Sequence, residues 1–118
     1  MSDYNLLHIC GYMGCHNDLR WHKDYPAKAI NWAAFFEGVP MEEGEEIFDH
    51  RCVIGGFDNN ADGVLYSGTK EEVQAETRAI LDKAGTCGVI LGADCTVPKD
   101  IDPARFDWVR DAAAAYHK

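Results

Sequence analysis

Three residues of this sequence carry side chains that bind soft metal ions, and their spacing predicts that they meet. His8 and Cys10 lie two positions apart in the apolar segment LLHICG, and Cys95 lies in the segment GADCTVP. Residues i and i+2 of a strand point to the same side. One imidazole and two thiolates suit Zn²⁺, with the fourth position open to a substrate. A thiol bound there would lose its proton and become the nucleophile that methyl transfer requires.

His8, Cys10 and Cys95 also have a simpler interpretation, as side chains that pack within strands. Other residues indicate a metal site more weakly. Asp94, next to Cys95, is placed to hydrogen-bond a ligating histidine. The pair Cys15 and His16 fits no common zinc spacing, so a surface or helix face explains it better than a local metal cluster. The remaining cysteines, Cys52 and Cys87, are expected in the core.

The elements that must position these side chains are short apolar runs bounded by glycine. Residues 6–10, 29–33, 51–54 and 88–91 form such runs, and each is short enough for a buried strand. A capping box at Thr69 and Glu72 opens a helix that Gly85 ends. Pro103 begins the last helix. Residues 40–48 predict a short acidic helix, and residues 15–24 another helix.

Strands that alternate with helices pair in parallel through right-handed crossovers. Four such βα units make either a small open sheet or half of a (β/α)8 TIM-type barrel, and periodicity alone does not choose between them. Both arrangements bring the carboxyl ends of the strands to one rim, where functional residues gather. The loop with Gly55, Gly56, Asp58 and Asn59 follows the third strand and is a possible substrate loop.

Composition narrows the classes of function. The 118 residues fit one domain spanning residues 1–118, and a formal net charge of −9 disfavours nucleic acid and anionic membrane surfaces. Apolar runs fall short of the roughly 18 residues that a membrane span needs, and the first residues do not read as a signal peptide. A cytoplasmic protein is expected. The odd count of 5 cysteines argues against a disulfide framework.

The stretches LLHICG, AINWA, IGGFDNN, SGTKEEVQAETRAILDKAG and GVILGADCTVPKDID resemble, in this order, the uroporphyrinogen decarboxylase superfamily. That superfamily also contains cobalamin- and coenzyme-M-dependent methyltransferases. The resemblance implies a (β/α)8 barrel of roughly three times this length. The chain would correspond to the C-terminal half of that barrel, its strands five to eight.

The resemblance also bears on the site. In the methyltransferase branch an H-x-C pair after one strand and a cysteine after the last strand hold zinc, and His8, Cys10 and Cys95 match these positions. The Gly-His-Gly motif of the decarboxylases is replaced here by residues 92–95, GADC. We therefore expect a zinc-thiolate domain that transfers a methyl group, from a corrinoid donor, to a small-molecule thiol. The alternatives are a decarboxylase-like protein of porphyrin biosynthesis with a tetrapyrrole ligand, and an inactive truncated fragment.

A half-barrel has unpaired edge strands and an exposed apolar face. We expect a homodimer, or a complementing N-terminal half, to cover them. Because His8 and Cys95 come from opposite edges of the sheet, such a dimer could share its zinc ligands between chains.

Overall fold

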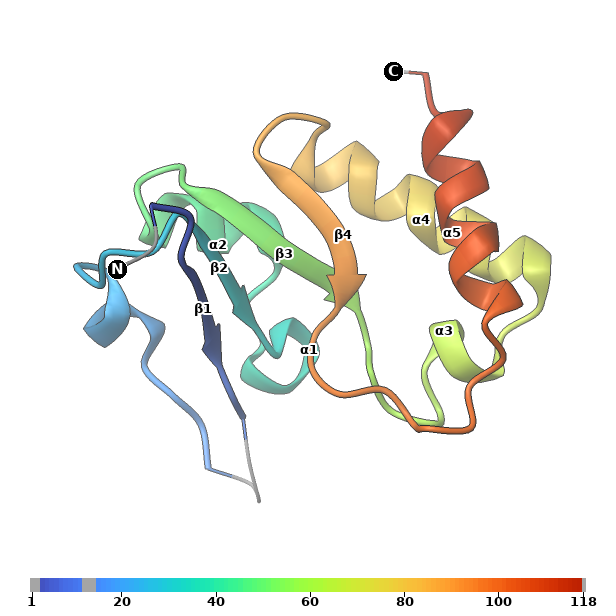
Figure 1. Cartoon of the computed structure of the whole chain (residues 1–118), viewed down its shortest axis with the longest axis horizontal. Coiled ribbons are helices and arrows are strands. Elements are labelled where there is room, and N and C mark those ends of the chain that lie inside the picture. Colours follow the sequence, from blue (N-terminus) through green and yellow to red (C-terminus); the bar gives the residue numbers. More distant parts are fainter. Residues whose placement is uncertain (1–2, 12–14, 118) are drawn as a thin grey trace.

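Four parallel strands form a single sheet whose order follows the chain. A computed structural model describes residues 3–11 and 15–117. The strands are β1 (Leu6–Ile9), β2 (Ala29–Trp32), β3 (Cys52–Phe57) and β4 (Val89–Ala93), in the order β1-β2-β3-β4 (Figure 1). All three pairings are parallel. The expected α/β class with four βα units is confirmed.

Five α-helices connect or follow the strands in the described part of the chain. They are α1 (Ala34–Glu37), α2 (Met41–Ile47), α3 (Val64–Ser67), α4 (Lys70–Ala84) and α5 (Ala104–Ala114). Helix α4 begins with the predicted capping box, in which the Thr69 side chain and the Glu72 carboxylate each accept a backbone N–H of the other residue. Pro103 precedes α5, as expected. No helix within residues 3–11 and 15–117 is long and apolar enough to cross a membrane.

The two faces of the sheet differ in what covers them. Ile30 pairs with Val53 across the sheet, and both side chains are fully buried beside Phe48 and Val73 from the helical layer. The next row of partners runs through His8, Asn31, Ile54 and Ile90 on the other face. In that row His8 is exposed, and Ile90 is 48% exposed. The helices therefore cover one face of the sheet and leave the other open.

The third strand is longer than predicted. We expected it to end at Gly55, but β3 continues through both glycines to Phe57 and pairs with β4 along the way. Gly55 and Gly56 have φ angles of 146° and 110°, which residues with side chains rarely adopt. The glycines thus serve the geometry of the strand itself and do not mark a turn.

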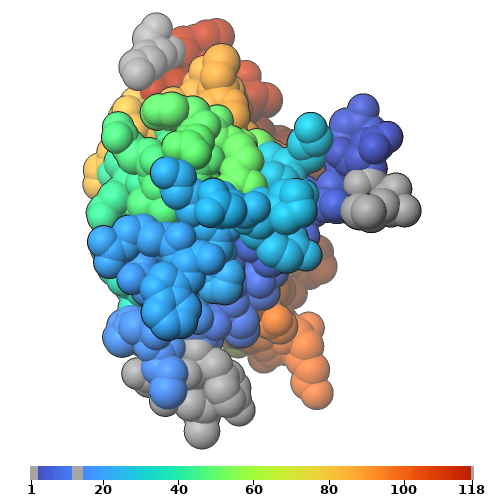
Figure 2. All heavy atoms as spheres, turned by 90° about the vertical axis from the view of Figure 1, so that its left-hand side faces the viewer, coloured from blue at the N-terminus to red at the C-terminus, as the bar shows by residue number. Residues whose placement is uncertain are grey.

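The segment between β1 and β2 also departs from the prediction. Only η1 (Leu19–His22), a single 3₁₀ turn, forms where residues 15–24 were expected to be helical. Asp18 caps this turn by accepting the N–H of Arg20, and Leu19 alone of its residues is buried. The segment has too few apolar positions to bury a longer helix. Seen from the β1 side, this blue segment spreads over the surface (Figure 2).

Candidate metal centre

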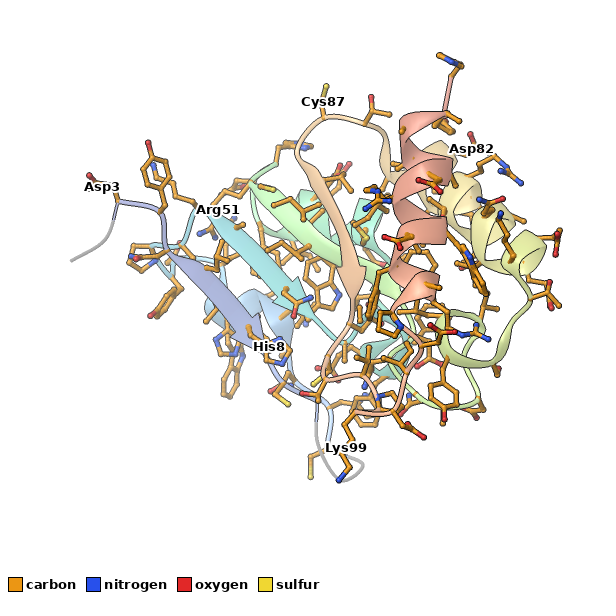
Figure 3. The ribbon with its side chains drawn as sticks, turned by 45° about the vertical axis from the view of Figure 1, so that its right-hand side comes forward. Asp3, His8, Arg51, Asp82, Cys87 and Lys99 are labelled. Atoms are coloured by element: carbon orange, nitrogen blue, oxygen red, sulfur yellow. The ribbon has the colours of Figure 1, made fainter. Side chains whose placement is uncertain are left out.

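The three predicted ligands converge at one point, within one chain. His8 projects from the C-terminal part of β1 (Figure 3), and Cys10 follows this strand directly. The Cys95 Sγ lies 3.5 Å from His8 Nε2 and 3.8 Å from Cys10 Sγ. The ligand atoms of all three residues lie within 4.8 Å of one another. The expectation that the ligands would be shared between two chains because they lie on opposite edges is therefore wrong.

The residues around Asp94 explain how Cys95 reaches β1. Beyond β4 the backbone bends toward the middle of the sheet, and Asp94 donates its N–H to the Phe57 carbonyl at 2.8 Å. The Asp94 carboxylate accepts the N–H groups of Phe35 at 2.9 Å and Gly56 at 3.2 Å. This side chain is 1% exposed, and its burial raises the pKa of Asp94 to about 6 although the backbone donors lower it. Asp94 thus anchors the loop that carries Cys95.

The expected histidine partner is a different residue. The structure places the Asp94 carboxylate on two backbone N–H groups, whereas His8 Nδ1 lies 2.5 Å from Asn31 Oδ1. Asn31 faces His8 directly across the β1–β2 pairing. An amide takes the place that we had predicted for a carboxylate, so the hydrogen bond to His8 adds no charge to the site.

Two of the three separations within the cluster match a tetrahedral zinc site, and the third, between His8 and Cys10, lies within 4.8 Å. Zn–S bonds of about 2.3 Å and Zn–N bonds of about 2.0 Å at tetrahedral angles separate two sulfurs by about 3.8 Å, and a sulfur from a nitrogen by about 3.5 Å. The observed separations are 3.8 Å between the sulfurs and 3.5 Å between Cys95 Sγ and His8 Nε2. Three protein ligands leave one position free, which is the pattern of a catalytic zinc.

The two thiols also influence each other. A hydrogen bond with Cys95, and then its charge, raise the pKa of the Cys10 thiol above its ordinary value. Two neighbouring sulfurs cannot both ionise easily without a cation between them. A bound divalent ion would remove this conflict, because it stabilises both thiolates at once.

A set of contacts that the sequence did not indicate holds the backbone at Cys10. Asn17 donates its side-chain N–H to the Cys10 carbonyl at 2.9 Å, and its backbone N–H to Glu37 at 2.8 Å. The Glu37 side chain is 1% exposed and also pairs with His16 at 3.1 Å. His16 stacks on Phe36, so it belongs to this support. Cys15, Cys52 and Cys87 lie outside the three-ligand cluster. Cys52 is partly buried, but Cys87 is exposed, so the expectation that Cys87 lies in the core is wrong.

The residues of the possible substrate loop form hydrogen bonds and packing contacts with other parts of the chain. Asn59 donates to the Thr96 carbonyl at 2.9 Å and so holds the segment after Cys95. Asp58 accepts both the backbone and the side-chain N–H of Asn60, which closes a turn. Gly55 and Gly56 leave room for neighbouring side chains. A β-carbon on Gly55 would lie 3.2 Å from Asp94 Oδ1, and one on Gly56 would lie 3.0 Å from Met41 Sδ.

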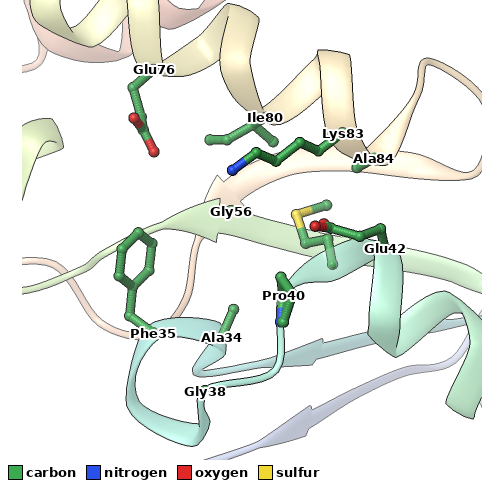
Figure 4. A pocket seen from close by; sticks show the side chains of 11 residues that line it. Ala34, Phe35, Gly38, Pro40, Glu42, Gly56, Glu76, Ile80, Lys83 and Ala84 are labelled. Atoms are coloured by element: carbon green, nitrogen blue, oxygen red, sulfur yellow. The ribbon is translucent and has the colours of Figure 1, made fainter.

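A separate hollow of about 370 Å³ lies on the helical side of the sheet. Apolar side chains of Phe35, Met41 and Ile80 line it between α1, α2 and α4, and Lys83 reaches across it (Figure 4). None of the three candidate ligands lines this hollow. The metal cluster and the hollow are therefore distinct features.

Comparison with known proteins identifies relatives of the sequence and of the fold. The family model "Uroporphyrinogen decarboxylase (URO-D)" matches residues 3–116. No curated protein sequence matches the chain. Among solved structures, a methyltransferase from Methanosarcina mazei is similar, with a TM-score of 0.71 and 17% sequence identity over 94% of this chain. The chain spans 31% of that methyltransferase, and the match confirms the expected piece of a TIM-type barrel.

Proposed function

Because this chain belongs to the uroporphyrinogen decarboxylase family, we propose that it is a methyltransferase-like domain whose zinc-thiolate site activates a small-molecule thiol as methyl acceptor. The observation that carries the proposal is the cluster of His8, Cys10 and Cys95, in which the distances from Cys95 Sγ to the other two ligand atoms match those of tetrahedral zinc. The methyltransferase fold of the structural neighbour supports the same kind of chemistry.

Each residue of the cluster has a role in the proposed reaction. His8, Cys10 and Cys95 would hold the ion, which supplies a Lewis acid that lowers the pKa of an acceptor thiol. His8 and Cys10 are exposed at the carboxyl-terminal rim of the sheet, so an acceptor can approach from this rim. In the transfer, the acceptor sulfur bonds to the methyl carbon while the bond from that carbon to the donor breaks. A corrinoid, which we propose as the donor, would supply the methyl group and retain the electron pair of the broken bond, and the thiol proton would pass to solvent.

Metal analysis of the purified protein tests the proposal. After expression with added zinc, wild type and Cys87→Ser should each hold about one zinc per chain, and Cys95→Ser should hold far less. Cys87 is the matched control because it is an exposed cysteine outside the cluster. If all three proteins lack zinc, the metal site is refuted and a decarboxylase-like relative or an inactive fragment becomes the better explanation.

We further propose that a second copy of the chain covers the open face. Strands β1 and β4 each pair on one side only, and Leu6 and Ile90 are 67% and 48% exposed on or beside this face. Two four-stranded copies arranged around one axis would supply the strands that a (β/α)8 barrel needs. The metal ligands are complete in each copy, so this dimer would carry two sites.

Light scattering at micromolar concentration tests the dimer. A mass of twice 13.1 kDa is expected. A monodisperse monomer refutes the homodimer. Association only with an added N-terminal barrel half shows instead that a complementing chain closes the barrel.

A further inference from the structure

We propose that Asn31 is the positioning residue of the cluster, and that its amide decides which ring nitrogen of His8 faces the cysteines. The inference rests on the proposed metal-binding function, but the hydrogen bonds that support it exist in the protein without metal. Asn31 lies on β2, opposite His8 in the register of the sheet. It contributes no ligand atom of its own.

The orientation of the Asn31 amide is fixed by its neighbours. Its Nδ2 lies 2.8 Å from the Ile54 carbonyl and 3.4 Å from the Ala93 carbonyl, and both of these oxygens can only accept hydrogen bonds. The nitrogen must therefore face the carbonyls, which turns Oδ1 toward His8. An amide oxygen can only accept, so the atom facing it, His8 Nδ1, must carry a proton.

This proton determines the chemistry of the other ring nitrogen. A neutral imidazole has one N–H, so a proton on Nδ1 leaves Nε2 with its lone pair free. His8 Nε2 is the atom that lies 3.5 Å from Cys95 Sγ. The ring thus presents its lone pair to the cluster before any ion arrives, and no tautomer change is needed on binding.

The same side chain joins all four strands of the sheet. His8 belongs to β1, Asn31 to β2, Ile54 to β3 and Ala93 to β4. Ala93 lies two residues before Cys95, so one amide links the strand that carries the histidine to the strand that leads to the third ligand.

The tautomer of His8 can be measured on the metal-free protein by ¹⁵N NMR of the ring, above the pH range in which imidazole titrates. Wild type should show the Nδ1–H form. Asn31→Asp keeps an acceptor and should retain this form, whereas Asn31→Leu removes the acceptor and should shift the ring toward the Nε2–H form. Asn60→Leu is the control, since Asn60 is exposed and its amide bonds only to Asp58.

Zinc affinity, measured by competition with a chromophoric chelator, gives the second readout. Asn31→Leu should weaken binding by about 10- to 100-fold, the usual effect of losing a partner of a ligating histidine. Asn60→Leu should bind as wild type does. Circular dichroism shows whether each variant is folded. The tautomer of His8 in the wild-type protein is measured without any variant, so this test does not depend on whether a variant folds.

Two results would overturn the inference. One is an Nε2–H tautomer of His8 in the metal-free wild type, and the other is a folded Asn31→Leu that keeps the wild-type tautomer and zinc affinity. A different result separates the two proposals: an Nδ1–H tautomer in a wild type that binds no zinc confirms the role of Asn31 toward His8 and refutes the metal site.

Discussion

Replacement of Gly55 by alanine should weaken both the fold and the candidate site, by two separable effects. The first is backbone strain, because Gly55 has a φ of 146°. The second is crowding, because the new β-carbon would lie 3.2 Å from Asp94 Oδ1. Asp94 anchors the loop that carries Cys95, so crowding at Gly55 reaches this ligand.

The size of the stability loss follows from these two effects. A residue with a side chain in a backbone conformation reserved for glycine costs about 1–3 kcal/mol. The contact with Asp94 adds to this, because the carboxylate is buried and its two backbone donors limit its movement. We expect a total loss of about 3 kcal/mol, which lowers the melting temperature of a chain this size by roughly 10–15 °C.

Gly88→Ala provides the matched control. Gly88 also has a positive φ, 73°, but a β-carbon there would have no atom within 4 Å. Gly88→Ala should therefore lose about 1–2 kcal/mol from strain alone and keep wild-type zinc affinity. Gly55→Ala should lose more stability and, in addition, bind zinc at least several-fold more weakly.

Thermal unfolding and chelator competition on wild type, Gly55→Ala and Gly88→Ala show whether crowding adds to backbone strain. Equal stability losses in the two variants, with unchanged zinc affinity in Gly55→Ala, would refute the reasoning. That outcome would mean that the glycine is required by the strand backbone alone and that Asp94 does not need the space beside it.

Three further predictions concern the helical layer and the open face. Gly44→Ala would place a β-carbon 2.1 Å from the ring of Trp32, so it should destabilise the protein by about 3 kcal/mol in urea titrations and shift the tryptophan fluorescence. The Thr69 N–H holds the pKa of Glu72 below its usual range, so the extra stability of wild type over Glu72→Gln should be present at neutral pH and vanish as the pH falls below about 4. Ile90→Asp puts a charge on the open face and should yield a monomer in light scattering where wild type is a dimer, while unchanged dimerisation would contradict barrel closure.

Much of the fold could be predicted from local patterns. The four apolar runs became strands because buried parallel strands need continuous apolar sequence, and α4 followed its capping box from Thr69 to Gly85. The prediction was wrong at Gly55 and Gly56. A glycine pair is typical of a turn, but here the requirement came from side chains more distant in sequence, Asp94 and Ile80, that pack against the strand.

The ligands of the candidate site could be predicted, but the residues that hold those ligands in position could not. His8 and Cys10 could be paired because alternate residues of a strand share a face, and Cys95 because the strand ends share a rim. Asn31 gave no signal, because an asparagine within AINWA gains its role only when the register places it opposite His8. Glu37 is similar. Its carboxylate accepts the Asn17 N–H and pairs with His16, and both of these residues lie in irregular backbone ahead of η1.

The sheet order has a consequence for how the chain folds. Every strand pairs with the strand next to it in sequence, so the sheet can grow unit by unit, although each parallel pairing must first close a loop of about 20 or more residues. The meeting of His8 and Cys10 with Cys95 is the exception, since it joins residues 85 and 87 positions apart. It encloses nearly the whole chain and can form only after both edge strands are in place. A ligand that binds these three residues at once would therefore link the two edge strands. It should slow hydrogen exchange at β1 and β4 together, although they are the two strands farthest apart in the sheet.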